Sequence, residues 1–261
     1  MVKSFVVGIF AGLLLIAGIG GTGAPQSRQK NAANQANQEE IRARFQAELA
    51  DATPVQFGVL TDRQRIHGQL FGGTDSTQIS DLAVPANRGQ AFGVYRTLTL
   101  EHHGPDTPEH YFGQIAAASD AVIRGLVTNK SSQLTPNASF VFTDYEMAVT
   151  EVLSNNPVSP VEVGHSIVVT ASGGKILLNG VVIIVVDEGF KPLPLDRDLV
   201  LFLRYIPETG AYQATGALQI DGSTITPLSS LQEFGPGALR TGRSLMKAEV
   251  LLGVLRSVSK R

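Results

Sequence analysis

The stretch SFVFTDYEMAVTEVL, residues 139–153, decides the fold of this 261-residue chain. Its side chains alternate between two sets along its whole length. One set comprises Val141, Thr143, Tyr145, Met147 and Val149, and the other comprises Phe140, Phe142, Asp144, Glu146 and Ala148. Because successive side chains of a β-strand point to opposite faces, this alternation predicts one long strand.

Further apolar runs of strand length surround this stretch from Ala116 onward. They are DAVIRGLVTNK (120–130), SIVVTAS (166–172), KILLNGVVIIVVDE (175–188) and LVLFLRYI (199–206). The Asn179-Gly180 pair between two apolar runs predicts a tight turn, which makes VVIIVVDE the return strand of a hairpin. We therefore expect a mainly β, β-rich α+β protein in which residues 116–217 form a small antiparallel barrel or a sandwich.

VVIIVVDE also has the form of the Walker-B strand of an ATPase, with two carboxylates after an apolar run. Such carboxylates act beside a phosphate-binding GxxxxGK[ST] loop. The GGK sequence at residues 173–175 is followed by Ile176 and has no upstream Gly at the required spacing. We therefore interpret VVIIVVDE as a buried structural strand, from which Asp187 and Glu188 emerge into solvent.

Residues 1–24 have the form of a secretory signal peptide. Lys3 precedes an apolar centre at residues 5–21, and small residues at 22–24 offer a cleavage site. This pattern predicts a secreted or periplasmic protein, with an uncleaved membrane anchor as the alternative. The chain has no Cys, which excludes a lipoprotein anchor, disulfides and thiolate metal sites.

Weaker patterns occupy both sides of the predicted β domain. Residues 25–52 are predicted to be a polar linker and then a short amphipathic helix, in which Ile41, Phe45 and Leu49 recur every four positions. Residues 53–115 are poorly defined, with VQFGVL, QLFGG and QAFGVYRTLTLE predicted as short strands. Residues 218–261 are predicted to be a loop and a C-terminal helix, spanning residues 239–260, that covers the core.

The densest group of chemically active side chains is EHHGPDTPEH, residues 101–110. His102, His103 and His110 are candidate zinc ligands. The alternative is a polar surface loop, because adjacent His side chains on a strand point to opposite sides and two prolines stiffen the segment. Residues 164–168, GHSIV, resemble a nucleophile elbow but have Val where Gly is required, so they predict a turn entering a strand. The sequence indicates no catalytic residue and no cofactor.

Residues 119–212 resemble an uncharacterised family of exported bacterial domains. The resemblance is carried by SDAVIRGLVT, FVFTDYEMAVTEVL, the GGK turn, FKPLPLDRDLVLFLRY and ETGAY. It implies an OB-like barrel of the kind found in netrin-like and metalloproteinase-inhibitor domains. The chain departs from the family pattern at residues 154–156 and 195–198. Inhibition in the netrin-like relatives depends on Cys, so the resemblance implies architecture and no activity.

Composition narrows the class of partner. The formal net charge is −2, with 21 basic and 23 acidic residues, and this balance gives no reason to expect a nucleic-acid partner. We expect a non-enzymatic module that binds a protein or a glycan in the cell envelope or outside the cell. Its contact edges are predicted to be an exposed loop at residues 130–138 and the Gly173-Gly174 turn. The alternatives are a metal-dependent hydrolase using His102, His103 and His110, and a structural subunit assembling through the C-terminal helix. Contact with a membrane is expected only through an uncleaved signal segment.

Overall fold

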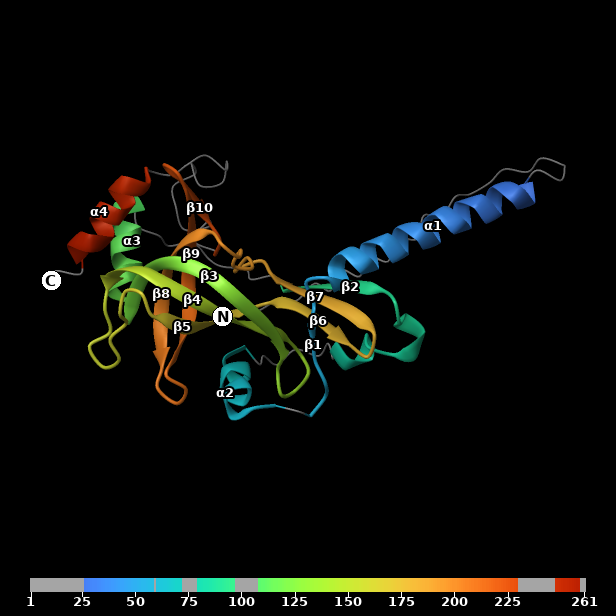
Figure 1. The fold of residues 1–261 in the computed structure, drawn as a ribbon, viewed down its shortest axis with the longest axis horizontal. Helices are drawn as coiled ribbons and strands as arrows, with labels where there is room; N and C mark the ends of the chain where they lie inside the picture. Colours follow the sequence, from blue (N-terminus) through green and yellow to red (C-terminus); the bar gives the residue numbers. More distant parts are fainter. Residues whose placement is uncertain (1–25, 59, 72–78, 97–107, 230–246, 259–261) are drawn as a thin grey trace.

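The computed structural model describes residues 26–58, 60–71, 79–96, 108–229 and 247–258 (Figure 1). Its helices and short 3₁₀ turns are α1 (Gln26–Leu49), α2 (Asp62–Phe71), η1 (Ile79–Asp81), η2 (Pro85–Asn87), α3 (Pro108–Ala117) and α4 (Ala248–Val258). Its strands are β1 (Thr53–Pro54), β2 (Ala91–Arg96), β3 (Ala121–Leu134), β4 (Val141–Ser154), β5 (Ser166–Ser172), β6 (Gly174–Leu178), β7 (Val181–Asp187), β8 (Asp198–Ile206), β9 (Ala211–Asp221) and β10 (Thr224–Pro227).

Five of the strands close into a ring. The larger sheet has the order β10-β9-β5-β4-β3-β8, and β8 also pairs with β9, so the ring runs β3-β4-β5-β9-β8. These pairings are antiparallel except for a short parallel contact between β5 and β9, at Val169 with Tyr212 and Thr170 with Gln213. The predicted β-rich α+β class, with antiparallel pairing and a C-terminal helix, is confirmed.

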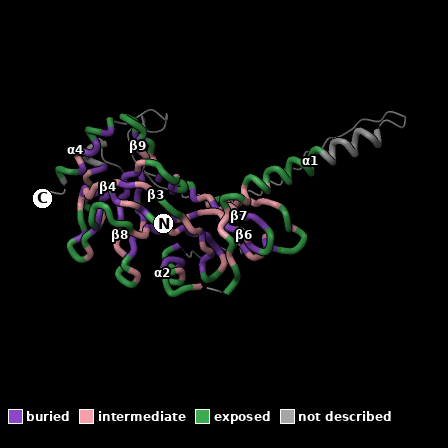
Figure 2. The backbone as a smooth tube through the Cα atoms, in the orientation of Figure 1, coloured by how far each residue is buried: buried purple, intermediate pink, exposed green. Residues whose placement is uncertain are grey.

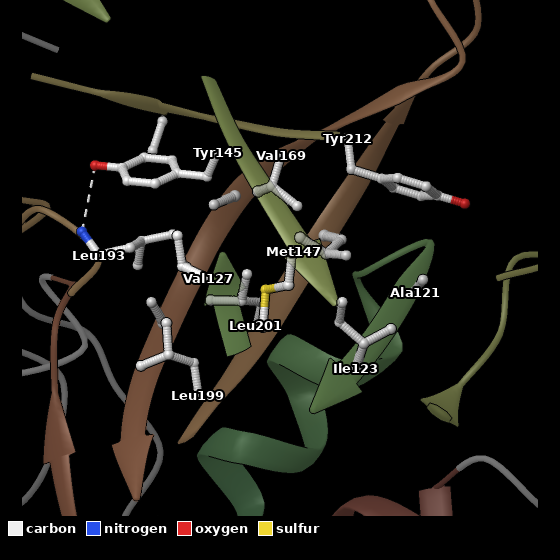
Figure 3. Packing of buried hydrophobic residues seen from close by; sticks show 14 of the residues in the cluster. Ala121, Ile123, Val127, Tyr145, Met147, Val169, Leu193, Leu199, Leu201 and Tyr212 are labelled. Atoms are coloured by element: carbon white, nitrogen blue, oxygen red, sulfur yellow. Dashed lines mark hydrogen bonds between the residues drawn. The ribbon is translucent and has the colours of Figure 1, made fainter. Parts of the chain in front are cut away.

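The alternation along β4 supplies two different apolar clusters. Tyr145 and Met147 point into the ring and pack with apolar residues of β3, β8 and β9, as Figure 3 shows. Phe142, on the opposite face, belongs to a different cluster, with residues of β6 and β7. The Leu193 N–H donates to the Tyr145 hydroxyl at 3.3 Å, so the polar end of this buried ring is satisfied.

The predicted hairpin is confirmed, but it lies outside the ring. Leu178 pairs with Val181, and Asn179 and Gly180 have φ of 52° and 78°, as a tight turn requires. The hairpin belongs to a second sheet of order β1-β6-β7-β2, in which β1 and β2 are parallel to their neighbours. An apolar run specifies a strand but not its neighbours. We therefore expected all these strands in one β domain, residues 116–217.

The end of β7 also differs from the expectation. Asp187 is buried, and its carboxylate accepts a hydrogen bond from the Gly189 N–H at 2.8 Å. Glu188 alone reaches solvent. Asp187 therefore serves the turn after the strand, and the prediction that both carboxylates emerge was wrong for this residue.

The predicted linker and short helix are one long helix, α1, which projects from the body of the molecule (Figure 1). Its sequence contains many Ala, Gln, Arg and Glu residues, whose helix propensity outweighs the lack of a wide apolar face. Figure 2 shows that its described side chains are mostly exposed, and Ile41 is 42% exposed. Within the described part of the chain, no helix combines the length and apolarity needed to cross a membrane.

Residues 53–115 contain more helix than the sequence indicated. QLFGG was predicted as a strand, but Gln69 to Phe71 form the end of α2. Only Thr53–Pro54 pairs as β1 near VQFGVL, whereas β2 confirms the strand predicted in QAFGVY. The helix α3 was not predicted.

The described end of the chain confirms a helix over the core. In α4, Leu251, Leu252 and Leu255 are buried with Phe112 of α3 and Phe202 of β8. Arg256 pairs with Glu151 of β4 at 2.7 Å. The earlier part of the predicted helix, residues 239–246, lies outside the described residues.

Candidate functional site

The short helix α2 starts with a reciprocal capping box. The Thr61 N–H donates to Gln64 Oε1 at 2.8 Å, and the Gln64 N–H donates to Thr61 Oγ1 at 3.2 Å. These two bonds satisfy backbone donors at the point where the helix begins. The sequence Thr61-Asp62-Arg63-Gln64 has the matching T-x-x-Q form, so this helix start was visible in the sequence.

His67 of α2 joins two distant parts of the ring. Its Nδ1 lies 2.8 Å from Asp144 Oδ1 of β4, and its Nε2 lies 2.9 Å from Thr209 Oγ1 in the β8–β9 turn. A carboxylate only accepts hydrogen bonds, so in the neutral ring Nδ1 carries the proton and Nε2 accepts from the Thr209 hydroxyl. The His67 side chain is completely buried.

Apolar contacts fix the rest of α2. Phe71 stacks on Phe142 with ring centroids 5.8 Å apart and an interplanar angle of 17°. A Cβ at Gly68 would lie 2.6 Å from Pro136 Cδ, so only glycine allows the helix to approach the β3–β4 loop this closely. The helix is therefore held against the face of β4 that points away from the ring interior, between the β3–β4 loop and the β8–β9 turn.

The order Asp144–His67–Thr209 is that of a carboxylate, a base and a hydroxyl nucleophile. Such a group also needs donors for an oxyanion, but the N–H groups of Thr209 and Gly210 both donate to the Ile206 carbonyl, at 3.2 and 3.0 Å. The base is also sealed from solvent. We interpret the three residues as a structural clasp for α2, and the name α2 clasp is used for them below.

A groove with two lobes runs past the start of α2. The larger lobe has a volume of about 730 Å³ and the smaller about 240 Å³. Residues shared by both lobes make them continuous: these are Thr61, Gln64, Ser131 and Gln133. The groove therefore lies between α2 and the outer half of β3, and the larger lobe extends to β1 and the β6–β7 turn.

The two lobes differ in charge. None of the described residues that line the larger lobe is charged. Its polar side chains are Thr53, Gln56, Thr61, Gln64, Ser131, Gln133 and Asn179, and its apolar ones are Pro54, Val55, Leu60, Leu134 and Leu177. The smaller lobe adds charges of both signs, from Arg63, Lys130, Asp144 and Glu146. Asp144 belongs to the α2 clasp, so the clasp forms part of the wall of the smaller lobe.

Two backbone N–H groups of β3 beside the groove donate hydrogen bonds to side chains. The Ser132 N–H donates to Thr53 Oγ1 at 3.0 Å, and the Lys130 N–H donates to Asn129 Oδ1 at 2.9 Å. Gln133 Nε2 donates to Ser131 Oγ at 2.7 Å, which orients the Gln133 amide and leaves its oxygen available to a ligand. These two N–H groups of the strand edge are therefore already paired, and side chains such as Gln133 offer hydrogen-bonding groups to the groove.

Two ion pairs fasten the end of α1 beside the groove. Lys130 lies 2.7 Å from Asp51, and Lys175 lies 2.6 Å from Glu48. Burial raises the pKa of Asp51, but the hydrogen bond and charge of Lys130 and the charge of Lys175 outweigh burial and hold this pKa below its ordinary value. Asp51 is half exposed, so solvent weakens these attractions.

The candidate zinc ligands are placed only in part. His110 lies in the first turn of α3, while His102 and His103 lie outside the described residues. Among the residues that the structure describes, no three His, Asp or Glu side chains converge on a point that could hold a metal ion.

The two predicted contact edges differ in outcome. Lys130, Ser131 and Gln133 line the groove, although they lie within β3 and not in a loop. The Gly173-Gly174 turn is packed inside the molecule, where Gly173 is buried, and offers no exposed edge. Comparison with known proteins finds no matching family model and no matching curated protein.

Proposed function

We propose that this protein is a non-enzymatic binding module that is exported and acts in the cell envelope or outside the cell. Its ligand, a glycan or a protein, binds in the two-lobed groove beside α2. The observation that carries this proposal is the continuity of the two lobes across four polar residues, with neutral side chains at one end and charges at the other. Specific sites are concave and contain a few well-placed polar groups.

The same proposal makes the five-stranded ring an OB-like barrel. In favour of it, the ring has the order β3-β4-β5-β9-β8. The parallel contact joins β5 and β9, which are the third and fifth strands of the ring in chain order. This arrangement supports the proposal of an OB-like barrel, and OB folds bind ligands on the face of their second and third strands and on flanking loops. Here α2 lies against the second strand, β4, and reaches the β8–β9 turn. The groove beside α2 therefore adjoins the face that such a fold uses.

Export and family membership rest on the sequence. Residues 1–24 have the form of a signal peptide, and residues 119–212 resemble exported bacterial domains. Assembly through the C-terminal helix receives less support, because Leu251, Leu252 and Leu255 of α4 are already buried against this chain's own core.

A photo-crosslinking residue in the groove tests the binding function. We expect benzoylphenylalanine at Gln133 to give discrete adducts when the protein is irradiated in its native cells, because Gln133 lines both lobes. The matched control is benzoylphenylalanine at Gln219, which lies on β9 and outside both lobes. Equal adducts at the two positions, or none at Gln133, would reject the groove as a binding site.

A further inference from the structure

We infer that the larger lobe of the groove binds a neutral oligosaccharide. This inference rests on the proposed binding function and assigns a ligand class to it. The lobe has a volume of about 730 Å³, within the range of roughly 300–1,000 Å³ that is typical of small-molecule sites. Its walls come from β1, the β6–β7 turn and the start of α2 as well as from β3, so elements outside the ring build it.

The chemistry of the walls selects uncharged ligands. Phosphates and carboxylates are bound in proteins chiefly by Arg and Lys, and none of the described lining residues of this lobe is basic. Amide side chains combine a donor and an acceptor, as sugar hydroxyl groups do. Four such amides line the lobe, those of Gln56, Gln64, Gln133 and Asn179. Gln64 Oε1 already accepts from the Thr61 N–H, and Asn179 Nδ2 already donates to the Ala83 carbonyl at 3.3 Å, so each of these two keeps part of its hydrogen-bonding capacity for a ligand. Apolar side chains such as Pro54 and Leu177 provide surfaces for the C–H faces of sugar rings.

The hydrogen bonds along β3 argue against an extended peptide. A peptide that adds to a sheet gains its affinity from free backbone groups at the strand edge. At this edge the N–H groups of Lys130 and Ser132 already donate to Asn129 Oδ1 and Thr53 Oγ1. These two N–H groups are therefore not free to pair with a peptide, whereas the neutral amides present both donors and acceptors to a ligand.

A binding panel tests the ligand class. The probes are neutral tetrasaccharides of glucose, mannose and N-acetylglucosamine, a heparin fragment as the anionic probe, and a library of extended peptides. We expect one of the neutral probes to bind with a Kd below 1 mM (about −4 kcal/mol). Saturation-transfer NMR with the full-length purified protein detects binding in this range. Gln133→Leu should weaken this binding about tenfold, the equivalent of one or two hydrogen bonds.

The control is Gln219→Leu, the same change on β9 outside both lobes, and it should leave the binding unchanged. Unchanged circular dichroism and melting temperature of Gln133→Leu show that the variant is folded. Binding of heparin or a peptide that depends on Gln133, with no neutral sugar bound, would overturn the oligosaccharide assignment and leave the binding function intact. If no probe binds in a way that depends on Gln133, the oligosaccharide assignment is also overturned. Crosslinking at Gln133 then decides separately whether the groove is a binding site.

Discussion

His67 Nδ1 lies 2.8 Å from Asp144 Oδ1, although 77 positions separate the two residues in the chain. This bond, with the one to Thr209, holds α2 against the ring, and the start of α2 lines the groove. A buried polar group that loses its partner costs about 1–3 kcal/mol. The α2 clasp is therefore expected to affect both stability and binding.

Removing the imidazole should destabilise the protein strongly. His67→Leu leaves Asp144 and Thr209 without their partner, and we expect the free energy of unfolding to fall by about 2–4 kcal/mol. Urea unfolding at pH 7 measures it. Asp144→Asn is the matched control, because an amide oxygen can still accept from Nδ1–H, and it should cost about 1 kcal/mol. A His67→Leu variant within 0.5 kcal/mol of the wild type would show that the clasp does not stabilise α2.

Gly174 is where the chain passes from β5 to the second sheet, and it should not tolerate a side chain. Its φ is 145°, and a Cβ there would overlap Thr143 Oγ1 and Ser132 Oγ. We expect Gly174→Ala to lower the free energy of unfolding by at least about 2 kcal/mol, from backbone strain and overpacking. Gly164→Ala, with φ of 84° and open space around it, isolates the backbone part, about 1–2 kcal/mol. Urea unfolding measures both variants. If they lose the same free energy of unfolding, the structure relaxes around the new Cβ at position 174 and the close contact costs nothing.

Tyr145 should make the protein unstable at high pH. Burial raises the pKa of this phenol to about 12, and the Leu193 hydrogen bond opposes the rise only in part. The unfolded phenol ionises near pH 10, so above it the unfolded state binds fewer protons and the stability falls as pH rises. We expect a loss of about 2–3 kcal/mol between pH 10 and pH 12 from this residue, since each pKa unit corresponds to about 1.4 kcal/mol.

The variant Tyr145→Phe tests this assignment. It should cost about 1 kcal/mol at pH 7, because the Leu193 N–H loses its acceptor, and should then lose less stability from pH 10 to pH 12 than the wild type. Burial also raises the pKa of Tyr212, so part of the alkaline loss remains. Tyr95→Phe, at an exposed site, should retain the full loss. An alkaline profile of Tyr145→Phe identical to that of the wild type would assign the effect to other groups.

Asp51 should attach α1 to the body in a pH-dependent way. Its pKa is lowered in the folded state, so its contribution is present above the ordinary carboxyl pKa of about 3.9 and is lost as the pH falls through the lowered value. The chain has no Cys, so Ile41→Cys provides a unique site for a spin label on α1. We expect the label to become more mobile as the pH falls through this lowered pKa. Asp51→Asn leaves the Glu48–Lys175 pair in place, so at pH 7 the label should be more mobile than in the wild type but not free. An unchanged spectrum there would refute a role of Asp51 in the attachment.

Strand positions could be predicted from the sequence because their causes are local. The alternation of β4 and the Asn179-Gly180 turn each specify a backbone conformation within a few residues. The division into two sheets depends on long-range pairings, such as Ala91 with Val182, which no local pattern encodes. The long helix α1 was divided because its polar composition was given more weight than its helix propensity.

The candidate site was harder to predict, for a physical reason. The T-x-x-Q pattern of the Thr61–Gln64 capping box can be recognised in the sequence. The glycines of QLFGG, which are unfavourable in a helix, nevertheless obscured the helix that this capping box starts. His67 acquires its role only when β4 and the β8–β9 turn come together around it. Residues 130–138 were singled out as an exposed loop, and part of that range does line the groove, but from a strand.

The hairpin of β3 and β4 takes part in all three apolar clusters that the described residues form. Val127 and Tyr145 belong to the first cluster, and Val122 and Leu153 to the second. Leu134 and Phe142 complete the third, which joins the two sheets. Melting of either sheet would strip contacts from the other, so thermal denaturation should proceed in one calorimetric step. Intermediates with bare strand edges would then be scarce, which protects the chain from edge-to-edge aggregation.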